Sequence, residues 1–295
     1  MRSVRILGTR VDALTKEGMQ AEVARMLTGP RLSAVAKINS EFLMRAAEDR
    51  EFAAYLETSD LNLADGAGVL WAARFLTLPT TRLRVLRQAQ TLTQAVVSLA
   101  ALVLRPSYCR WPLPERIPGV QALYAMLEVA AKVGAPVFFL GARADVNRRA
   151  REIISSQHPH LLIAGGCDGY QPDRTAVVGP IEESEARLLI VALGSPKQEY
   201  WIRDHRERLT RVRMAVGEGG SLDFIAGDFR RAPRWMQEKG LEWLWRLFMN
   251  EDRTGAKSRP RRIWNSVPRF IWRVVCWKLK HGPVSVEESR PAEPR

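Results

Sequence analysis

The chain contains few cysteines and no apolar leader. Its three cysteines, Cys109, Cys167 and Cys276, are odd in number and widely spaced along 295 residues. A disulfide framework or a cysteine zinc site is therefore not expected, and a reducing compartment fits best. The first eight residues lack the apolar core of a signal peptide. We expect a protein that stays in the cytoplasm.

Acidic residues are fewer than basic ones, and one common nucleotide-binding motif is missing. The chain has 45 Lys and Arg against 32 Asp and Glu, a net charge of +13 and a pI near 10.3. This excess indicates an anionic partner, which can be a nucleic acid, an acidic lipid or a phosphorylated substrate. No Gly-Xaa-Gly-Xaa-Xaa-Gly follows the first expected strand at 4–7, which argues against the dinucleotide fingerprint of oxidoreductases.

What the sequence does contain is an apolar run that leads directly into a helix signal. Leu188–Leu193 is too short for a globular helix and predicts a strand buried on both faces of a parallel sheet. After Gly194, Ser195 suits a helix N-cap, Pro196 the first helical position and Gln198 the third, as in a capping box. Unpaired backbone N–H groups at such a helix start favour anionic ligands.

A second strand-to-turn edge follows about twenty residues later. Residues 214–216 lead into Gly217-Glu218-Gly219-Gly220-Ser221, where three glycines in four positions allow a phosphate close to the backbone. Two such edges predict a nucleotide crevice at the carboxyl ends of a parallel sheet. A pair of plain glycine turns is the alternative.

Two polar residues follow other expected strands. Asn39 comes after the strand at 33–38, and it is either a ligand contact or a turn residue. Asp65 ends the short strand at 61–64 and precedes two glycines and a helix. An acid at that place is either a helix cap or a general base held by a rigid sheet. Further strands and helices alternate from 120 to 164, which predicts βαβ units and an α/β, Rossmann-like parallel sheet.

The composition changes after residue 229. Residues 230–280 contain fourteen Lys or Arg, four acids and six of the nine tryptophans. We expect a catalytic domain at 1–228, a basic, Trp-rich helical appendage at 229–282 and a disordered tail at 283–295. Basic residues interleaved with tryptophan are typical of a membrane interface, of a nucleic-acid binder or of a solvated helix with Trp in its core.

Successive motifs of the chain resemble the bacterial WecG/TagA/CpsF glycosyltransferases. The resemblance is carried by Ala64–Gly68, Gly194–Glu199, Gly217–Gly227, Arg231–Pro233 and Gly240–Leu247. It implies an inverting transfer of a sugar, N-acetylmannosamine-type or hexose, from UDP to a polyprenyl-diphosphate-linked sugar. The products of such enzymes enter teichoic acid linkage units, enterobacterial common antigen, capsule or exopolysaccharide.

Pattern and resemblance together give a candidate site. Asp65 is the proposed catalytic base of the family. Because no two aspartates stand two positions apart, the usual Asp-Xaa-Asp metal clamp is missing, and we expect no metal or other cofactor. Arginines and helix N-termini would then hold the departing diphosphate. The substrate-binding candidates are Asn39, Gly194, Lys197, Gln198, Glu199, Gly217, Gly219, Gly220, Ser221, Arg231, Arg246 and Arg253.

The chain departs from the family in two places. Pro118 and Gln121 replace the Thr and Asp of a family Thr-Gly-Xaa-Asp pattern, which leaves the identity of the donor sugar open. An insert at 79–111 carries five arginines and no acid, with no charge between Gln88 and Leu104. It is either a helix that lies on a membrane or a helix packed on the domain.

The predicted partners are therefore a UDP-sugar, a lipid-diphosphate-linked acceptor and an anionic membrane surface, with a homo-oligomer possible and no nucleic acid. The predicted location is peripheral, on the inner face of the plasma membrane. Two other classes remain as alternatives, a nucleotide-binding oxidoreductase and a non-enzymatic nucleic-acid-binding protein.

Overall fold

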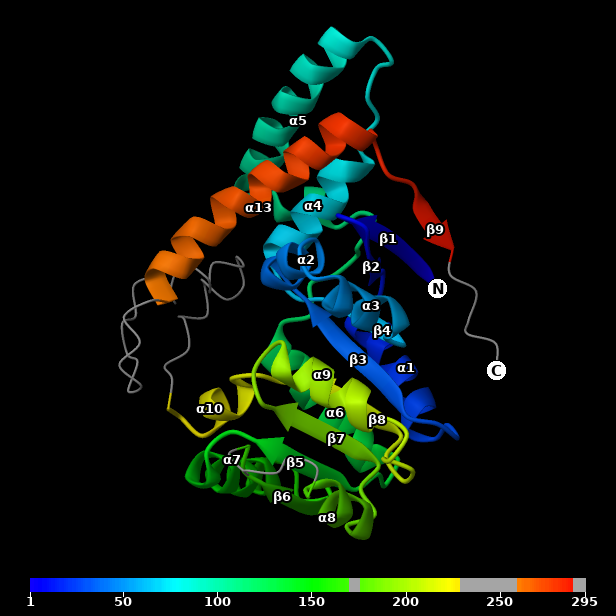
Figure 1. Ribbon diagram of the computed structural model, residues 1–295, viewed down its shortest axis with the longest axis vertical. Coiled ribbons are helices and arrows are strands. Elements are labelled where there is room, and N and C mark those ends of the chain that lie inside the picture. The colour runs from blue at the N-terminus through cyan, green and yellow to red at the C-terminus, as the bar shows by residue number, and fades with distance from the viewer. Residues whose placement is uncertain (170–175, 229–258, 289–295) are drawn as a thin grey trace.

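The computed structural model describes residues 1–169, 176–228 and 259–288. At its centre lies a six-stranded parallel sheet with the strand order β4-β3-β8-β7-β5-β6 (Figure 1). The strands are β3 (Ser33–Ile38), β4 (Leu61–Ala64), β5 (Val137–Gly141), β6 (Ile163–Cys167), β7 (Leu188–Ala192) and β8 (Met214–Gly217). The predicted α/β fold with a parallel sheet is confirmed.

Helices cover both faces of this sheet, as parallel strands require. They are α1 (Lys16–Leu27), α2 (Ser40–Ala46), α3 (Arg50–Thr58), α4 (Ala67–Thr77), α5 (Arg84–Leu104), the 3-10 helix η1 (Pro106–Cys109), α6 (Gly119–Lys132), α7 (Ala144–Gln157), α8 (Val178–Glu183), α9 (Lys197–His205), α10 (Ser221–Ile225) and α13 (Arg259–His281). Successive residues of a strand point to opposite faces. In β7, Leu188 and Ile190 pack in the core that contains α1, α6, α7 and α10, whereas Leu189 and Val191 pack against α8 and α9.

Buried apolar runs form the strands where the sequence predicts them. Every residue of β3 and of β7 is buried, which confirms the strand at 33–38 and the run that begins at Leu188. Thr15 caps α1, because its side chain accepts a hydrogen bond from Gly18 N at 3.2 Å.

The two ends of the chain form a second, small sheet. β1 (Arg2–Ile6), β2 (Thr9–Asp12) and β9 (Val286–Glu288) pair antiparallel in the order β2-β1-β9 (Figure 1). The early strand predicted at 4–7 therefore exists, but it lies outside the parallel sheet. The expectation of disorder from 283 is wrong for residues 286–288, because β1 supplies these residues with ladder hydrogen bonds. Residues 289–295 lie outside the described part of the chain.

The helix α13 belongs to the core of the domain. Phe270, Val274 and Val275 are 2%, 0% and 4% exposed, and they pack in one apolar cluster with residues of α2, α3 and α4. The membrane-interface interpretation of the segment 229–282 is therefore wrong for these three residues. Trp272, which is 65% exposed, faces outward instead.

Candidate active site

Four neighbouring strands end in polar or glycine-rich segments at the same edge of the sheet. Asp65 follows β4, Lys37 lies near the end of β3, Glu218 follows β8, and Gln198 lies in α9 after β7. Because β4, β3, β8 and β7 are consecutive in the sheet and parallel, their carboxyl ends lie side by side. This edge of the sheet therefore brings together residues that follow four strands, whereas the two glycine motifs predicted it from two strands only.

Asp65 lies between β4 and α4, one position before the N-cap of the helix. Its backbone N–H donates to the carbonyl of Ile38 at 2.8 Å, which continues the pairing of β4 with β3. The N-cap of α4 is Gly66, whose φ of 127° favours glycine. Gly66, not Asp65, thus occupies the N-cap position, and the half-buried carboxylate of Asp65 stands at the rigid edge of the sheet.

Lys37 and Glu218 form a buried ion pair that sequence reasoning missed. The Lys37 ammonium pairs with Glu218 Oε2, and the two side chains are 8% and 0% exposed. Lys37 Nζ also donates to the carbonyl of Gly119 at 3.5 Å. Burial raises the pKa of Glu218, while the attraction of Lys37 and a hydrogen bond from Ser221 oppose this rise. The sequence feature that could have indicated this pair is Lys37 itself, the only charged residue in the six-residue strand β3.

The glycine-rich turn after β8 is clamped by the start of α9. Gln198 Oε1 accepts a hydrogen bond from Gly219 N at 2.9 Å, and Gln198 Nε2 donates to Glu199 Oε1 at 2.7 Å. A side chain at Gly217 would overlap Gln198 and lie 2.9 Å from Glu199 Oε1. Gly217 is therefore required for close packing, and Gly219, with a φ of 47°, for the turn itself.

This arrangement corrects the predicted capping box. The helix α9 begins at Lys197 with Pro196 as its N-cap, no side chain caps it, and the Ser195–Pro196 peptide bond is cis. Gln198 instead joins α9 to the turn after β8. Glu199 is 2% exposed, and burial raises the pKa of its carboxyl, while hydrogen bonds from Gln198 and Ser195 oppose the rise. Gln198 thus bonds to the glycine turn directly, and Glu199 bonds to Gln198.

The remaining candidates are distributed unevenly around this edge. Asn39 caps α2 by accepting a hydrogen bond from Phe42 N at 3.0 Å. This agrees with the interpretation of Asn39 as a turn residue. Ser221 is buried, Gly194 is half-buried, and Lys197 and Gly220 are exposed. Arg231, Arg246 and Arg253 lie outside the described residues.

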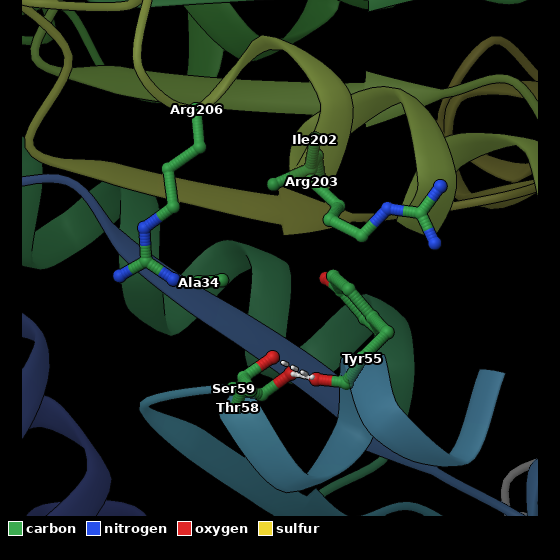
Figure 2. A pocket seen from close by; sticks show the side chains of 7 residues that line it. All are labelled: Ala34, Tyr55, Thr58, Ser59, Ile202, Arg203 and Arg206. Carbon is green, nitrogen blue, oxygen red and sulfur yellow. Dashed lines mark hydrogen bonds between the residues drawn. The ribbon is translucent and has the colours of Figure 1, made fainter. Parts of the chain in front are cut away.

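A small pocket lies at the opposite end of β3, between α3 and α9 (Figure 2). Its walls include Tyr55, Arg203 and Arg206, and the Thr58 and Ser59 hydroxyls donate to the carbonyl of Tyr55. Arg206 donates to Leu32 O just before β3, so the pocket lies at the amino ends of the strands. Burial raises the pKa of the Tyr55 hydroxyl. No predicted site residue lines this pocket.

Other ligand signals are limited in the described parts of the chain. Within 1–169, 176–228 and 259–288, no group of three His, Cys, Asp or Glu is placed to hold a metal ion. Over the same residues, no helix has both the length and the hydropathy that crossing a bilayer requires. The strand edge thus presents one carboxylate, Asp65, beside a buried ion pair and a glycine turn whose Gly219 N–H donates to Gln198.

Comparison with known proteins supports a transferase. The model of the glycosyl transferase WecG/TagA/CpsF family matches residues 4–100 and 85–283, and the two matched segments overlap within the insert. A Bacillus subtilis (strain 168) protein is 32% identical over 216 residues, which is 73% of this chain and 71% of that protein. A Bacillus spizizenii protein is 28% identical over 253 residues, which is 86% and 81% of the two chains. Both are named N-acetylglucosaminyldiphosphoundecaprenol N-acetyl-beta-D-mannosaminyltransferase.

Proposed function

Because the chain belongs to the WecG/TagA/CpsF family of glycosyl transferases, we propose that it moves a sugar from a UDP donor to a polyprenyl-diphosphate-linked sugar. The names of the two relatives specify an N-acetylmannosaminyl group and an acceptor made of N-acetylglucosamine, diphosphate and undecaprenol. The same classes of donor and acceptor are the first to test for this chain. Pro118 and Gln121 replace a Thr and an Asp of the family pattern. The donor sugar of this chain can therefore differ from that of its relatives.

The observation that supports this function best is the place of Asp65. A single displacement at the anomeric carbon requires a base that takes the proton of the acceptor hydroxyl. Asp65 is held at the carboxyl end of β4 by its hydrogen bond to Ile38, next to the turns after β3 and β8. A carboxylate on a rigid strand end meets the geometric need of a general base better than one on a loop.

The departing UDP requires positive charge or hydrogen-bond donors at its diphosphate. In the glycine turn after β8, the backbone N–H groups of Glu218, Gly219 and Ser221 donate within the protein, which leaves the exposed Gly220 to contact a phosphate at the same sheet edge as Asp65. Arg231, Arg246 and Arg253 would add bidentate contacts, and Arg246 is the first choice because it lies in a family motif. We propose that these groups replace a metal ion, since the sequence has no Asp-Xaa-Asp clamp.

A direct activity screen tests the proposal. The full chain would be incubated with a set of UDP-sugars and a short-chain polyprenyl-diphosphate N-acetylglucosamine, and the products weighed by mass spectrometry, with and without a chelator. A mass increase of one sugar on the lipid acceptor, unchanged by the chelator, is the expected result. Turnover of a nicotinamide cofactor, or salt-dependent binding to random DNA without sugar transfer, would instead favour one of the two alternative classes.

The proposed place of action is the inner face of the plasma membrane, and α5 supplies the contact. This helix packs on the domain mainly through small and polar residues, because Thr91, Ala95 and Ser98 are its buried positions, with Leu99 and Leu102 partly buried beside them. Its outer side is apolar, which is the reverse of an ordinary surface helix. The exposed apolar residues of the insert include Leu83 at 64%, Val85 at 76%, Leu86 at 56%, Leu92 at 50%, Val96 at 69%, Val97 at 56%, Val103 at 65% and Leu104 at 83%.

The charge of the insert supports an anionic lipid surface as the partner. Five arginines lie at 82, 84, 87, 105 and 110, and residues 79–111 carry no acid. Each basic residue near an anionic leaflet contributes about 1 kcal/mol to binding. Figure 1 shows α5 at one extreme of the molecule, with its far end beyond α4 and α13. An apolar outer face with basic ends fits a helix that lies in the headgroup region.

Liposome flotation tests this contact with matched variants. The double variant Leu92→Glu/Val96→Glu should lose binding to liposomes that contain phosphatidylglycerol, because two carboxylates would enter the apolar region. Leu162→Glu is the control, since Leu162 is 53% exposed near the amino end of β6, at the other end of the molecule (Figure 1). If the parent chain does not float at low salt, or if the outer face of α5 instead pairs two copies in sedimentation runs, the membrane contact is wrong.

A further inference from the structure

A buried ion pair lies beside the candidate base and has no assigned role. Lys37 stands in β3 and Glu218 directly follows β8, so two neighbouring parallel strands bring them together. Removing two charges from water is costly, and an apolar pair of similar size often stabilises a fold as well or better. The position of this pair at the strand edge therefore indicates a role beyond stability.

The geometry places the Lys37 ammonium close to the Asp65 carboxylate. A Cβ on Gly119, the first residue of α6, would lie 3.3 Å from Lys37 Nζ and 3.6 Å from Asp65 Oδ2. The two groups thus flank one small space, which Gly119 leaves empty because it has no side chain. The charge of Asp65 also contributes to the raised pKa of Glu218, after the larger effect of burial. The three charged groups form one interacting cluster.

We propose that Lys37 is a positioning residue for Asp65, held in place by Glu218 and by the carbonyl of Gly119. Its ammonium stabilises negative charge on the neighbouring carboxylate, so that Asp65 stays ionised and ready to accept a proton. Lys37 is 8% exposed and acts through Asp65, not by contact with substrate. The inference rests on the proposed function, in which Asp65 is the base.

One further charged residue, Arg116, lies on a segment that packs against this edge. Arg116 precedes α6, and the hydrogen bond from Ile117 N to Ala64 O at 2.9 Å places this segment against the end of β4. The first turn of α4, at 67–70, has no charged residue. Asn39, which is neutral, occupies the end of β3 as the cap of α2. A variant that neutralises Lys37 and Glu218 leaves Arg116 unchanged. The effect of the ion pair on Asp65 can therefore be measured separately from any effect of Arg116.

The test is the double variant Lys37→Met/Glu218→Gln. Either single change leaves a buried charge without its partner and can unfold the protein, whereas the double change removes both charges and keeps similar side-chain volumes. Two pH titrations would be compared with the parent. One is the profile of kcat/KM for sugar transfer, and the other is the 13C NMR titration of the Asp65 carboxyl, identified by its absence in Asp65→Asn.

The expected result is that both curves of the folded double variant move to higher pH by up to about one unit. Lys37 stands on the strand between those of Asp65 and Glu218, so the loss of its attraction outweighs the loss of the more distant repulsion from Glu218. Below the parent midpoint, kcat/KM should then fall by up to about tenfold, while affinity for the donor stays that of the parent. Asp60→Asn is the control. Asp60 pairs with Arg31 at 2.8 Å and with Arg206 at 3.0 Å at the opposite edge of the sheet, so its loss should leave both curves unchanged.

Titration curves of the folded double variant that coincide with those of the parent would overturn the proposal. The NMR titration does not depend on catalysis. If the parent chain shows no sugar transfer, the proposed function fails. A shift of the Asp65 carboxyl would then still support the action of Lys37 on Asp65, and an unshifted carboxyl would refute it.

Discussion

Asp65 is the residue on which the proposed chemistry depends most directly. We expect Asp65→Asn to lower kcat by a factor of about 10² to 10⁴, because asparagine keeps the size of the side chain and removes its basicity. Sugar transfer would be measured on protein whose thermal unfolding matches the parent. Asp204→Asn is the control, since Asp204 lies in α9 with a side chain 52% exposed and pairs with its neighbour Arg203. Normal turnover in a folded Asp65→Asn variant would rule out the base assignment.

Gly217 is the glycine whose replacement should be most harmful at the strand edge. A Cβ there would overlap Gln198 and crowd Glu199 Oε1 at 2.9 Å, and both side chains are buried. We expect Gly217→Ala to lower the free energy of unfolding by about 1–3 kcal/mol, as overpacking does, and to weaken binding of UDP. Urea unfolding and titration calorimetry would measure the two effects.

Gly179→Ala in α8 serves as the matched control for this substitution, because no atom lies within 4 Å of a Cβ at that position. It should be neutral or slightly stabilising. Equal urea midpoints for the two alanine variants would contradict the clamped turn.

At this scale the sequence predicts residues that follow strands and misses residues that pair across them. Asp65 and the glycine turn could be found because each directly follows a short apolar run. Lys37 and Glu218 are 181 positions apart, and only the order of β3 and β8 in the sheet brings them together. Gln198 was misassigned for a related reason: its partner, Gly219, lies 21 positions away, beyond the local window in which a capping box is recognised.

Among the elements, α13 carries a lysine whose ionisation should affect stability. Lys278 is fully buried, and its Nζ donates to the carbonyl of Phe75 and, at 2.8 Å, to Gln94 Oε1. Burial, with a smaller effect of Arg74, lowers the pKa of Lys278 from 10.5 to about 8. Between these two values the unfolded chain binds more protons at this site than the folded chain does. The stability of the parent should therefore rise as pH increases from about 8 to about 10.5.

Comparison with Lys278→Met isolates this contribution, since the variant lacks the titrating group. We expect the free energy of unfolding of the parent, minus that of Lys278→Met, to increase with pH across the same window. Urea midpoints at several pH values would measure it. The control is Lys280→Met, because Lys280 lies in the same helix and is exposed. A difference that stays flat for Lys278→Met would show that the amine is not desolvated.

The elements differ in how well their sequence reveals them. Strands buried on both faces, such as β3 and β7, were predicted from their runs of apolar residues. The strand β9 was missed because three residues in a Pro- and Glu-rich tail gain strand structure only by pairing with β1, which is more than 280 positions earlier. The direction in which α5 faces could not be predicted either. Its apolar periodicity suggests a buried side, yet Thr91, Ala95 and Ser98 make that contact.

Across the whole molecule, the C-terminal helix and the strand edge belong to one packed unit. Phe270 of α13 lies edge-on to Trp71 of α4 with ring centroids 6.3 Å apart. A Cβ on Gly68, three positions after Asp65, would lie 3.5 Å from the Phe270 ring. The composition change at 229 predicted a separate appendage, because charge and tryptophan content do not reveal which side of a helix packs inward. Instead, α13, which lies in this basic segment, packs against α4, the helix that follows Asp65.

This packing predicts a large cost for one substitution and a small cost for its near neighbour. Phe270→Ala should lower the free energy of unfolding by about 3–5 kcal/mol, since it empties a buried aromatic site, and should reduce sugar transfer because α4 would lose support next to Asp65. Trp272→Ala removes a larger side chain that is 65% exposed, so it should change stability by only about 0.5 kcal/mol. Urea unfolding followed by far-UV circular dichroism would measure both. A single transition in the parent that Phe270→Ala shifts strongly and Trp272→Ala does not would establish α13 as part of the catalytic domain, whereas equal, small shifts would mean that α13 is an appendage after all.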